Sequence, residues 1–412
     1  MERAPLATVL AMLAAAAACD TDEPTAPPIA HPVPTAAVTA SATVLGRVTV
    51  DEPQDVGLFT SIVSSSDGTQ RVTYVDASND RLKYAACASS CTVAGNWQRG
   101  VIDQSVDVDS YTSLKVKSGV RHVVYYDRTN GNLKYASCAS DCYLENNWKK
   151  VTIDQTGDVG KFASLAIGGN GRLHVSYADA TNYGLRYATC LVSCTSAIYW
   201  RRTTAVSGIS VVGYTSTAVG GDGRVHVAFH NHGALRYATC PASCSNPANW
   251  EGLAVEGNGA ALNVGIGADI AIDGNGVRHI TYHEVTDENL RYARCASNCS
   301  NSAGWQRVVV DIGSGYYGSN VGSHTSVAVG SDGKVHVSYA DVTAGRLKYA
   351  SCARYCWLTS SWQRQSVDGG GVIVGSGSFA GRYTSLALGG GKVHVSYYNH
   401  TYGNLRYAEL TQ

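Results

Sequence analysis

The sequence predicts an all-β fold, a seven-bladed β-propeller of four-stranded antiparallel blades that occupies residues 43–412. Two observations carry this prediction. A motif recurs about seven times at a spacing of roughly 50 residues, which is typical of stacked supersecondary units. The last copy ends before its fourth strand, and a segment ahead of the first copy carries the missing strand. The repeat overrides the roughly two or three domains that chain length alone suggests.

Each copy is predicted to form four strands, shown here for the second copy. Tyr111–Leu114 begins the first strand. A turn leads to the second strand, whose sequence in other copies is Val-His-Val-Ser-Tyr, with side chains that alternate between the two faces of the sheet. The turn Thr129–Gly131 precedes the third strand, Leu133–Ala136. After a cysteine loop, Trp148 opens the fourth strand, Lys150–Ile153. Four antiparallel strands at this spacing describe a propeller blade.

The two ends of the repeat region are complementary. The last copy stops at Leu405–Glu409 without cysteines, Trp or a fourth strand. The segment Leu45–Asp51 matches the fourth-strand text Trp305–Asp311 of an internal copy. We therefore expect an N-terminal strand that completes the last blade and removes the open sheet edges. An open solenoid, which needs polar capping repeats at both ends, is the alternative.

The composition fits such a fold and excludes one class of partner. The chain of 412 residues has 44 glycines and 25 tyrosines but only 4 phenylalanines and 2 methionines, which is typical of many turns and half-buried aromatic strands. Lys and Arg together number 32, as do Asp and Glu, so the net charge is zero. No basic excess is available for a phosphate backbone, and we expect no nucleic-acid partner.

The first 42 residues indicate export. An apolar, Ala-rich stretch after Arg3 ends in Ala16, Ala17, Ala18 and Cys19, so residues 1–19 are predicted to be a lipoprotein-type signal peptide. This ending resembles the lipobox of bacterial lipoproteins, in which the cysteine is acylated, although Ala16 stands where that family usually has Leu. An ordinary secretory signal is the alternative. Residues 20–42, rich in Pro, Thr and Ala, are predicted to be a disordered linker.

The cysteines support the same compartment. Twelve of the 13 cysteines form six pairs with three residues between the partners, which in an exported chain predicts disulfides. Zinc is the alternative, but each pair offers only two thiolates and no regularly placed histidine. Cys19 is left over, in agreement with lipidation. The predicted disulfide pairs are Cys87–Cys91, Cys138–Cys142, Cys190–Cys194, Cys240–Cys244, Cys295–Cys299 and Cys352–Cys356.

A histidine recurs in the second strand of six copies, with Arg71 in the first. Successive histidines of a ring lie too far apart to share an ion, so we predict no metal site. We expect each histidine, beside a Ser or Thr such as Ser176, to form hydrogen bonds across blades. No cofactor is expected, and a calcium ion in the channel is left open. The histidines are His122, His174, His226, His279, His336 and His394.

Two further repeated positions are predicted to be structural. A basic residue before the third-strand Tyr is interpreted as a cross-strand packing feature. A Trp after each cysteine loop, from Trp97 to Trp362, is expected to cover a blade edge. The basic residues are Lys83, Lys134, Arg186, Arg236, Arg291, Lys348 and Arg406.

The candidate site lies on one rim. If the first strands line the channel, their starts share a rim with the turns between second and third strands. Aromatic faces beside carboxylate and amide groups suit sugar rings or an extended peptide; turn capping is the alternative for the acids. The expected aromatic ring is Phe59, Tyr111, Phe162, Tyr214, His324 and Tyr383. The expected outer ring is Asp76, Asp127, Asp179, Asn231, Glu284, Asp341 and Asn399.

Departures from the repeat are expected on the same rim, where irregular loops on a rigid scaffold carry specificity. The fifth copy has Gly267 in place of the aromatic residue and Asp269 in place of the following Ser. The other departures are His230 and His232 in the fourth copy, His283 in the fifth, and the longer segments with Tyr316, Tyr317 and Phe379.

The phrase His336–Asp341, followed by Leu347–Ala350, resembles the repeats of exported bacterial β-propeller lipoproteins, loosely sialidase/BNR-like in architecture. The resemblance covers about residues 44–412. A sialidase implies an arginine cluster, an acid/base Asp, a Tyr nucleophile and Asp-box turns. The turn Ser65–Thr69 carries only a fragment of that box and no Trp follows it, so no catalytic residue is carried over.

These observations predict a binding or scaffold protein, tethered to the membrane surface of the bacterial cell envelope by a lipid anchor, or secreted. We expect a monomer that recognises a glycan or an envelope protein. A sialidase-like glycan hydrolase or lyase is the alternative, and a hydrolase would need two facing carboxylates, for which Asp269 and Glu284 are the candidates. A structural role without a small ligand is the third possibility.

Overall fold

The computed structural model describes most of the repeat region. The predicted signal peptide, Cys19 and nearly all of the linker lie outside the described residues, as do Tyr316, Tyr317 and Phe379. No helix within the described part is long and apolar enough to cross a membrane. The described residues are 41–105, 107–108, 110–209, 212–257, 262–313, 319–369 and 380–412.

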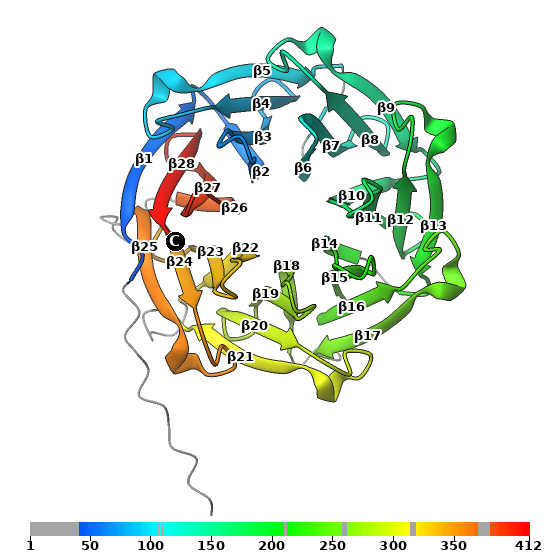
Figure 1. The fold of residues 1–412 in the computed structure, drawn as a ribbon, viewed down its shortest axis with the longest axis vertical. Coiled ribbons are helices and arrows are strands. Elements are labelled where there is room, and N and C mark those ends of the chain that lie inside the picture. Colours follow the sequence, from blue (N-terminus) through cyan, green and yellow to red (C-terminus); the bar gives the residue numbers. More distant parts are fainter. Residues whose placement is uncertain are drawn as a thin grey trace, which may run out of the picture. The chain divides into compact units, whose positions relative to one another are not determined.

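Residues of the repeat form seven four-stranded antiparallel sheets arranged around a central axis (Figure 1). Blade one holds β2 (Val56–Ser64), β3 (Gln70–Asp76), β4 (Arg81–Cys87) and β5 (Gln98–Asp103). Blade two holds β6 (Thr112–Lys117), β7 (Val120–Asp127), β8 (Asn132–Cys138) and β9 (Lys149–Asp154). Blade three holds β10 (Val159–Ile167), β11 (Leu173–Asp179), β12 (Gly184–Cys190) and β13 (Arg201–Val206). Blade four holds β14 (Val212–Val219), β15 (Val225–Asn231), β16 (Ala234–Cys240) and β17 (Glu251–Glu256).

The remaining blades have the same arrangement. In blades five and six the strands follow one another in numerical order from the channel outward. Blade five holds β18 (Val264–Ile272), β19 (Arg278–Glu284), β20 (Asn289–Cys295) and β21 (Gln306–Asp311). Blade six holds β22 (Val321–Val329), β23 (Val335–Asp341), β24 (Arg346–Cys352) and β25 (Gln363–Gly369). Blade seven holds β26 (Ala380–Gly389), β27 (Lys392–Asn399), β28 (Asn404–Thr411) and β1 (Val44–Asp51). Short 3-10 helices lie in the cysteine loops: Ala94–Asn96, Glu145–Asn147, Ala197–Tyr199, Pro247–Asn249, Ser302–Gly304 and Thr359–Ser361.

The predicted closure of the ring is confirmed. Strand β1 runs antiparallel to β28, with Val48 opposite Tyr407 and Thr49 opposite Arg406, and forms the outer strand of the last blade (Figure 1). The N-terminal strand thus covers the edge that β28 would otherwise expose.

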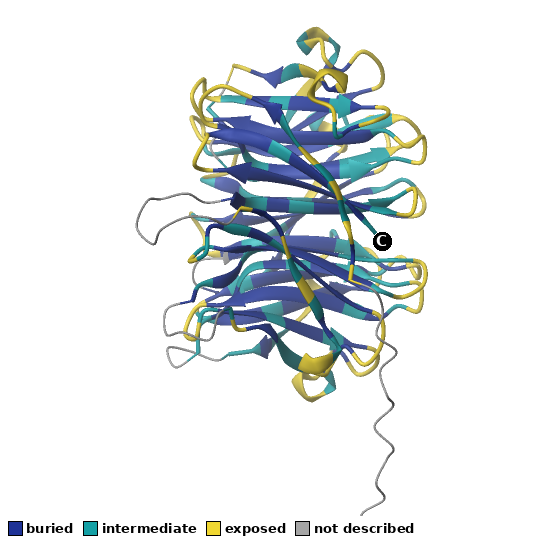
Figure 2. Ribbon diagram, turned by 90° about the vertical axis from the view of Figure 1, so that its left-hand side faces the viewer, coloured by how far each residue is buried: buried dark blue, intermediate teal, exposed yellow. Residues whose placement is uncertain are grey.

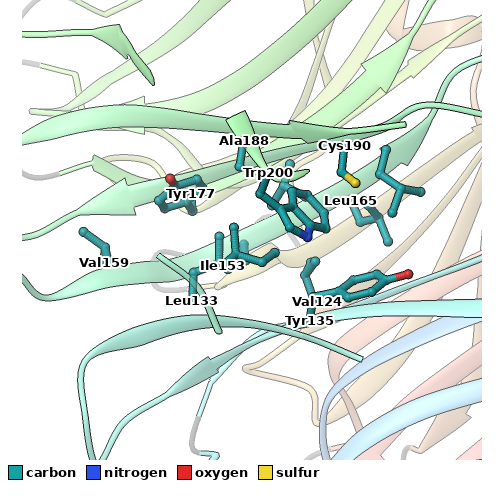
Figure 3. Close-up of a cluster of buried hydrophobic side chains, with 13 residues drawn as sticks. Val124, Leu133, Tyr135, Ile153, Val159, Leu165, Tyr177, Ala188, Cys190 and Trp200 are labelled. Carbon is teal, nitrogen blue, oxygen red and sulfur yellow. The ribbon is translucent and has the colours of Figure 1, made fainter. Parts of the chain in front are cut away.

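The hydrophobic core lies between blades rather than within them. One cluster joins Leu133 and Tyr135 of blade two to Leu165, Tyr177 and Trp200 of blade three, all buried (Figure 3). The strands are buried along most of their length, and exposed residues concentrate in the turns (Figure 2). A single blade has no partner for its apolar faces, which is why the unit must repeat.

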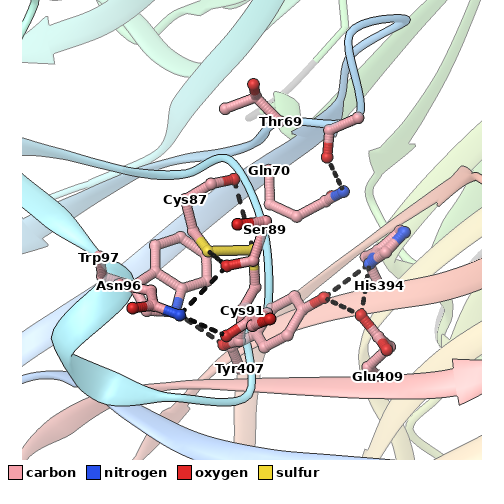
Figure 4. The surroundings of a disulfide bond; sticks show 12 residues. Thr69, Gln70, Cys87, Ser89, Cys91, Asn96, Trp97, His394, Tyr407 and Glu409 are labelled. Atoms are coloured by element: carbon pink, nitrogen blue, oxygen red, sulfur yellow. Dashed lines mark hydrogen bonds and ion pairs between the residues drawn. A yellow bond between two sulfur atoms is a disulfide. The ribbon is translucent and has the colours of Figure 1, made fainter.

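All six predicted disulfides are present. They indicate an extracellular or otherwise oxidising compartment. Each closes a short loop, so the chain-entropy estimate of its contribution is about 2 kcal/mol. The Trp after each loop, buried in five cases and half-buried at Trp250, donates its indole N–H to the second cysteine's carbonyl, 2.8 Å for Trp97 and Cys91 (Figure 4). The indole also packs edge-on against the preceding blade, with ring centroids 5.2 Å apart for Trp97 and Tyr407.

At six of the seven interfaces an acid joins one blade to the next; five of these acids are buried and Glu256 is half-buried. At the end of β5, the Asp103 carboxylate accepts hydrogen bonds from the Tyr125 hydroxyl at 2.7 Å and from the Lys134 ammonium at 2.9 Å, both in blade two. The basic residue interpreted as a cross-strand packing feature is therefore an ion-pair partner of the preceding blade. The interface before blade four differs, because Val206 replaces the acid and Phe229 the tyrosine. The acids are Asp51, Asp103, Asp154, Glu256, Asp311 and Asp368.

The repeated histidines are structural, but their predicted partners were wrong. Each histidine Nδ1 contacts the third-strand Tyr hydroxyl of its own blade, 2.6 Å for His336 and Tyr349, rather than a neighbouring blade. Where it is a Ser or Thr, the residue two positions further along the strand makes the cross-blade bond instead, as between Ser176 and Thr215 at 2.8 Å. Tyr187 stands opposite Ser176 and diagonal to His174 on the same face of the sheet, so its long side chain reaches the imidazole within the blade.

We expect Asp103 to contribute to stability only while the side chains that donate hydrogen bonds to it are present. Asp103→Val should lower the free energy of unfolding by about 3–5 kcal/mol, because the Lys134 ammonium and the Tyr125 hydroxyl lose their acceptor. Adding Tyr125→Phe reproduces the Val206–Phe229 arrangement and should recover about 1–3 kcal/mol, since no buried hydroxyl is left unpaired. Urea denaturation of both single variants and the double variant measures this. A double variant less stable than Asp103→Val contradicts it.

The histidines make stability depend on pH. Burial lowers the pKa of His336 to about 4, whereas in the unfolded chain it is about 6.5. Only the unfolded chain takes up the proton between these values, so stability is complete above pH 6.5 and falls as the pH drops toward 4. The slope is at most about 1.4 kcal/mol per pH unit for each such histidine. Denaturation between pH 4 and 7 should show a shallower slope for His336→Gln; an unchanged slope contradicts the assignment.

Candidate functional site at the channel mouth

The innermost strands line a channel that contains a cavity with a volume of about 250 Å³. One end of it, which we call the mouth, lies where these strands begin. Aromatic residues lie there, followed along each strand by a Thr or Ala and then by a Ser or Asp. Each first strand therefore contributes the same three successive levels to the wall.

The aromatic residues have an unusual backbone conformation. All have left-handed φ angles, from 37° at Tyr111 to 57° at Phe162, a conformation that bulky residues rarely adopt. The equivalent Gly267 has φ 63°. At Phe59, Phe162, Gly267 and Tyr383 the carbonyl accepts a hydrogen bond from the Thr hydroxyl of the next blade, 3.0 Å from Thr112 to Phe59. At these positions the neighbouring blade holds the left-handed residue in place.

The six side chains at this level form a collar of contacting rings. The contacts run from Tyr214 through Phe162, Tyr111, Phe59 and Tyr383 to His324, with centroid separations of 5.0, 4.6, 4.7, 4.2 and 4.6 Å in that order. All are half-buried. Thus the structure brings the predicted aromatic ring together, while its role in ligand binding stays a prediction.

The collar is interrupted at blade five. Gly267 has no side chain, and no ring contact joins Tyr214 to His324 among the described residues. We call this opening the notch. Burial, with a smaller effect of Arg382, lowers the pKa of His324 to about 4, so its imidazole is neutral at pH 7. Burial also raises the pKa of Tyr111 and of Tyr383 elsewhere in the collar. On the side of blade six the notch is therefore bordered by a neutral imidazole.

Below the collar, hydroxyl groups tie each blade to the next. The Ser of one first strand accepts a hydrogen bond from a backbone N–H of the following blade, as from Leu114 to Ser61 at 3.0 Å. In blade five Asp269 takes this role and accepts from the Val327 N–H at 2.8 Å. We call these seven residues the acceptor ring: Ser61, Ser113, Ser164, Ser216, Asp269, Ser326 and Ser385.

Asp269 is the one carboxylate among the described residues that line this cavity. Besides the Val327 N–H, it accepts hydrogen bonds from the Ser216 hydroxyl at 2.6 Å, the Ser326 hydroxyl at 3.2 Å and its neighbour's N–H. The side chain is half-buried below the notch. The prediction that Asp269 lies near the aromatic ring is confirmed.

The outer ring of acids and amides does not line the cavity. Asp127 caps its turn by accepting from the Asn130 backbone N–H at 3.1 Å, and Asp341 does the same for Ala344 at 2.9 Å. Glu284 is buried and forms an ion pair of 2.9 Å with Arg291. Asp76, Asp179 and Asn399 likewise accept hydrogen bonds within their own turns, while Asn231 is buried. Turn capping accounts for these residue types, and a ligand role for them stays an untested prediction.

One lining residue, Lys115, was not among the residues predicted from the sequence. It lies two residues beyond Ser113 on β6, and its side chain enters the channel wall. The signal was in the sequence, because every other copy has a small apolar residue at this position. These residues are Val63, Ala166, Ala218, Ala271, Ala328 and Ala387.

The propeller resembles solved structures of proteins whose activities differ from one another. No protein-family model matches the chain, and neither does any curated protein. An ulvan lyase, a polysaccharide lyase, is 12% identical over 89% of this chain and 94% of that one, with a TM-score of 0.54. The phage phi92 endosialidase is 11% identical over 90% and 69%, with a TM-score of 0.51. Hydrazine synthase of Kuenenia stuttgartiensis is 10% identical over 87% and 97%, with a TM-score of 0.55. These likenesses show the fold alone.

We expect Asp269 to be replaceable by the residue of the other blades. Asp269→Ser keeps an acceptor for the Val327 N–H and should unfold at nearly the same urea concentration as the natural chain. Asp269→Val removes the acceptor and should lower the free energy of unfolding by about 1–3 kcal/mol, because a buried N–H loses its partner. Equal destabilisation by the two substitutions would show that the carboxylate itself is structural.

Proposed function

We propose that this chain is a binding protein whose channel mouth accepts one end of a glycan. The notch in the collar carries the proposal. It leaves an opening bordered by the faces of half-buried rings, with the Asp269 carboxylate and a ring of hydroxyl groups below it. Aromatic faces suit the apolar face of a sugar. The hydroxyl groups of Ser61, Ser113, Ser164 and Ser385, whose hydrogens have no acceptor among the described residues, can donate to its oxygen atoms.

The dimensions favour a short ligand segment. The cavity of about 250 Å³ is smaller than the range of about 300–1,000 Å³ typical of sites for drug-sized molecules. We therefore assign the mouth to a terminal sugar unit rather than to a long stretch of polymer. The fold shared with polysaccharide lyases and an endosialidase is compatible with a glycan ligand. An envelope protein that presents such a glycan is the related partner.

The cellular setting is part of the proposal. The six disulfides fit a protein that works in an oxidising compartment. We propose that acylation of Cys19 anchors a monomer to the membrane surface, with residues 20–42 as a spacer between anchor and propeller. Metabolic labelling with a clickable fatty acid tests the anchor, since Cys19→Ser should abolish the label.

Binding is favoured over hydrolysis by the placement of the carboxylates. A glycosidase of the common kind needs two carboxyl groups about 5–9.5 Å apart on either side of the scissile bond. The described cavity lining offers Asp269 alone, and its oxygens accept four hydrogen bonds. Glu284, the other candidate, is held in the ion pair with Arg291. We therefore propose no hydrolytic acid–base pair.

A glycan array followed by calorimetry with the best ligand tests the proposal. Tyr214→Ala should weaken binding about tenfold, equivalent to about 1.4 kcal/mol, because it removes a ring beside the notch. Gly267→Phe should abolish binding, because it supplies the missing member of the collar; other blades carry aromatic residues at the same φ. Tyr199→Ala, which removes an exposed tyrosine in a cysteine loop, is the matched control and should leave binding unchanged.

Two results would contradict the proposal. Unchanged affinity in the folded Gly267→Phe variant would exclude the notch as the entrance. Turnover of a glycan substrate that is lost in Asp269→Asn would instead establish an enzyme. Urea unfolding of each variant confirms that it is folded before its binding is compared.

A further inference from the structure

Lys115 is a cationic side chain with no hydrogen bond or ion pair among the described residues. It lies on β6, is half-buried and lines the channel wall. The five Ala residues and one Val at the equivalent positions show that the propeller does not require a lysine here. An ammonium group removed from water without a partner is costly, which points to a function for the charge.

The lysine lies where two cavities of the channel meet. Its side chain lines both the mouth cavity and a second cavity, which Lys117, Ala166 and Val219 also line. Asp269 is the charged group that acts on it across the channel, but no ion pair forms between them. The Asp269 oxygens are already occupied by four hydrogen bonds. Burial lowers the pKa of Lys115, and Asp269 partly offsets this effect.

The hydroxyl groups of the acceptor ring divide into two sets. Ser216 and Ser326 donate to Asp269. The other four also accept a backbone N–H of the next blade, but their own hydroxyl hydrogens have no acceptor among the described residues. They come from blades seven, one, two and three, the part of the ring that includes β6. These residues are Ser61, Ser113, Ser164 and Ser385.

We propose that this half of the channel is an anion site, in which Lys115 and the serine hydroxyls bind a carboxylate or a small inorganic anion. A cation with four hydroxyl donors is complementary to such a group, since charge-assisted hydrogen bonds are the stronger kind. The anion is either the carboxylate of an acidic sugar that enters through the notch, or a free ion such as chloride. The first source rests on the proposed function, and the second is independent of it.

The natural repeat supplies the test variant. Lys115→Ala introduces the residue that five other blades carry, so we expect it to fold. Lys149→Met is the matched control, because Lys149 is an exposed lysine on β9 of the same blade and lines neither cavity. Calorimetry of the full chain in chloride-free buffer at constant ionic strength uses sodium glucuronate, sodium chloride and neutral glucose as probes. Lys115→Ala should weaken binding of the anionic probe at least tenfold, and Lys149→Met should change it less than twofold.

The outcomes separate the two sources. Binding of glucuronate but not of chloride assigns the carboxylate of an acidic sugar, and the reverse assigns a free ion. In either case the bound anion should slow acetylation of Lys115 by an amine-reactive ester, read by peptide mass spectrometry. Absence of binding by both anions, or equal binding in Lys115→Ala, overturns the anion site. Neutral glycans that still bind both proteins in that case would leave the proposed function standing.

Discussion

The contact between successive blades is the constraint on which the rest of this protein depends. Six of the seven blades end in an acid that accepts from a tyrosine and a basic residue of the next blade, as Asp103 does for Tyr125 and Lys134. The acid that accepts from the tyrosine of blade one is Asp51, which lies on β1 in blade seven. The N-terminal strand thus closes the ring twice, once by pairing with β28 and once by supplying the acid that blade one needs. The disulfides act only within single loops.

Departures from the repeat are of two kinds. In a paired departure both residues of a contact are replaced together, and in an unpaired one a single residue is replaced. Where Val206 replaces the acid, Phe229 replaces its tyrosine partner. The hydroxyl pair that joins Thr112 to Thr73 is lost on both sides at the next interface, where Ala163 and Val124 stand, and again at Ala268 and Ala228. Losing both partners costs little, whereas losing one leaves a buried group unsatisfied. Paired departures are therefore structural. Lys115 and Gly267 have no such compensating change, which is why the proposals for function rest on these two positions.

The sequence predicted the blades, the closure and the disulfides because each is written as a local motif at a fixed spacing. It did not predict the histidine partner, because histidine, serine and tyrosine recur together in nearly every copy and so carry no information about which pair is in contact. The left-handed backbone of the collar was also missed, since bulky residues usually avoid it. Gly267 at the same position was the available signal for that conformation. Lys115 was overlooked among the more conspicuous departures at the rim.

The collar itself argues that the mouth is more than a by-product of the fold. Residues in sparsely populated backbone regions cost about 1–3 kcal/mol each, and glycine at all seven positions would avoid this strain. Contacts between neighbouring rings return about 0.5–1.5 kcal/mol per pair, so packing within the collar offsets only part of the cost. The six strained residues thus form a continuous arc of rings, and the glycine leaves one opening between its two ends. That opening leads to the carboxylate of Asp269 and, beyond it, to the uncompensated charge of Lys115. Under the proposed function, a ligand that enters there would meet apolar faces first and charges second, an order that suits a sugar ring carrying a polar or anionic substituent.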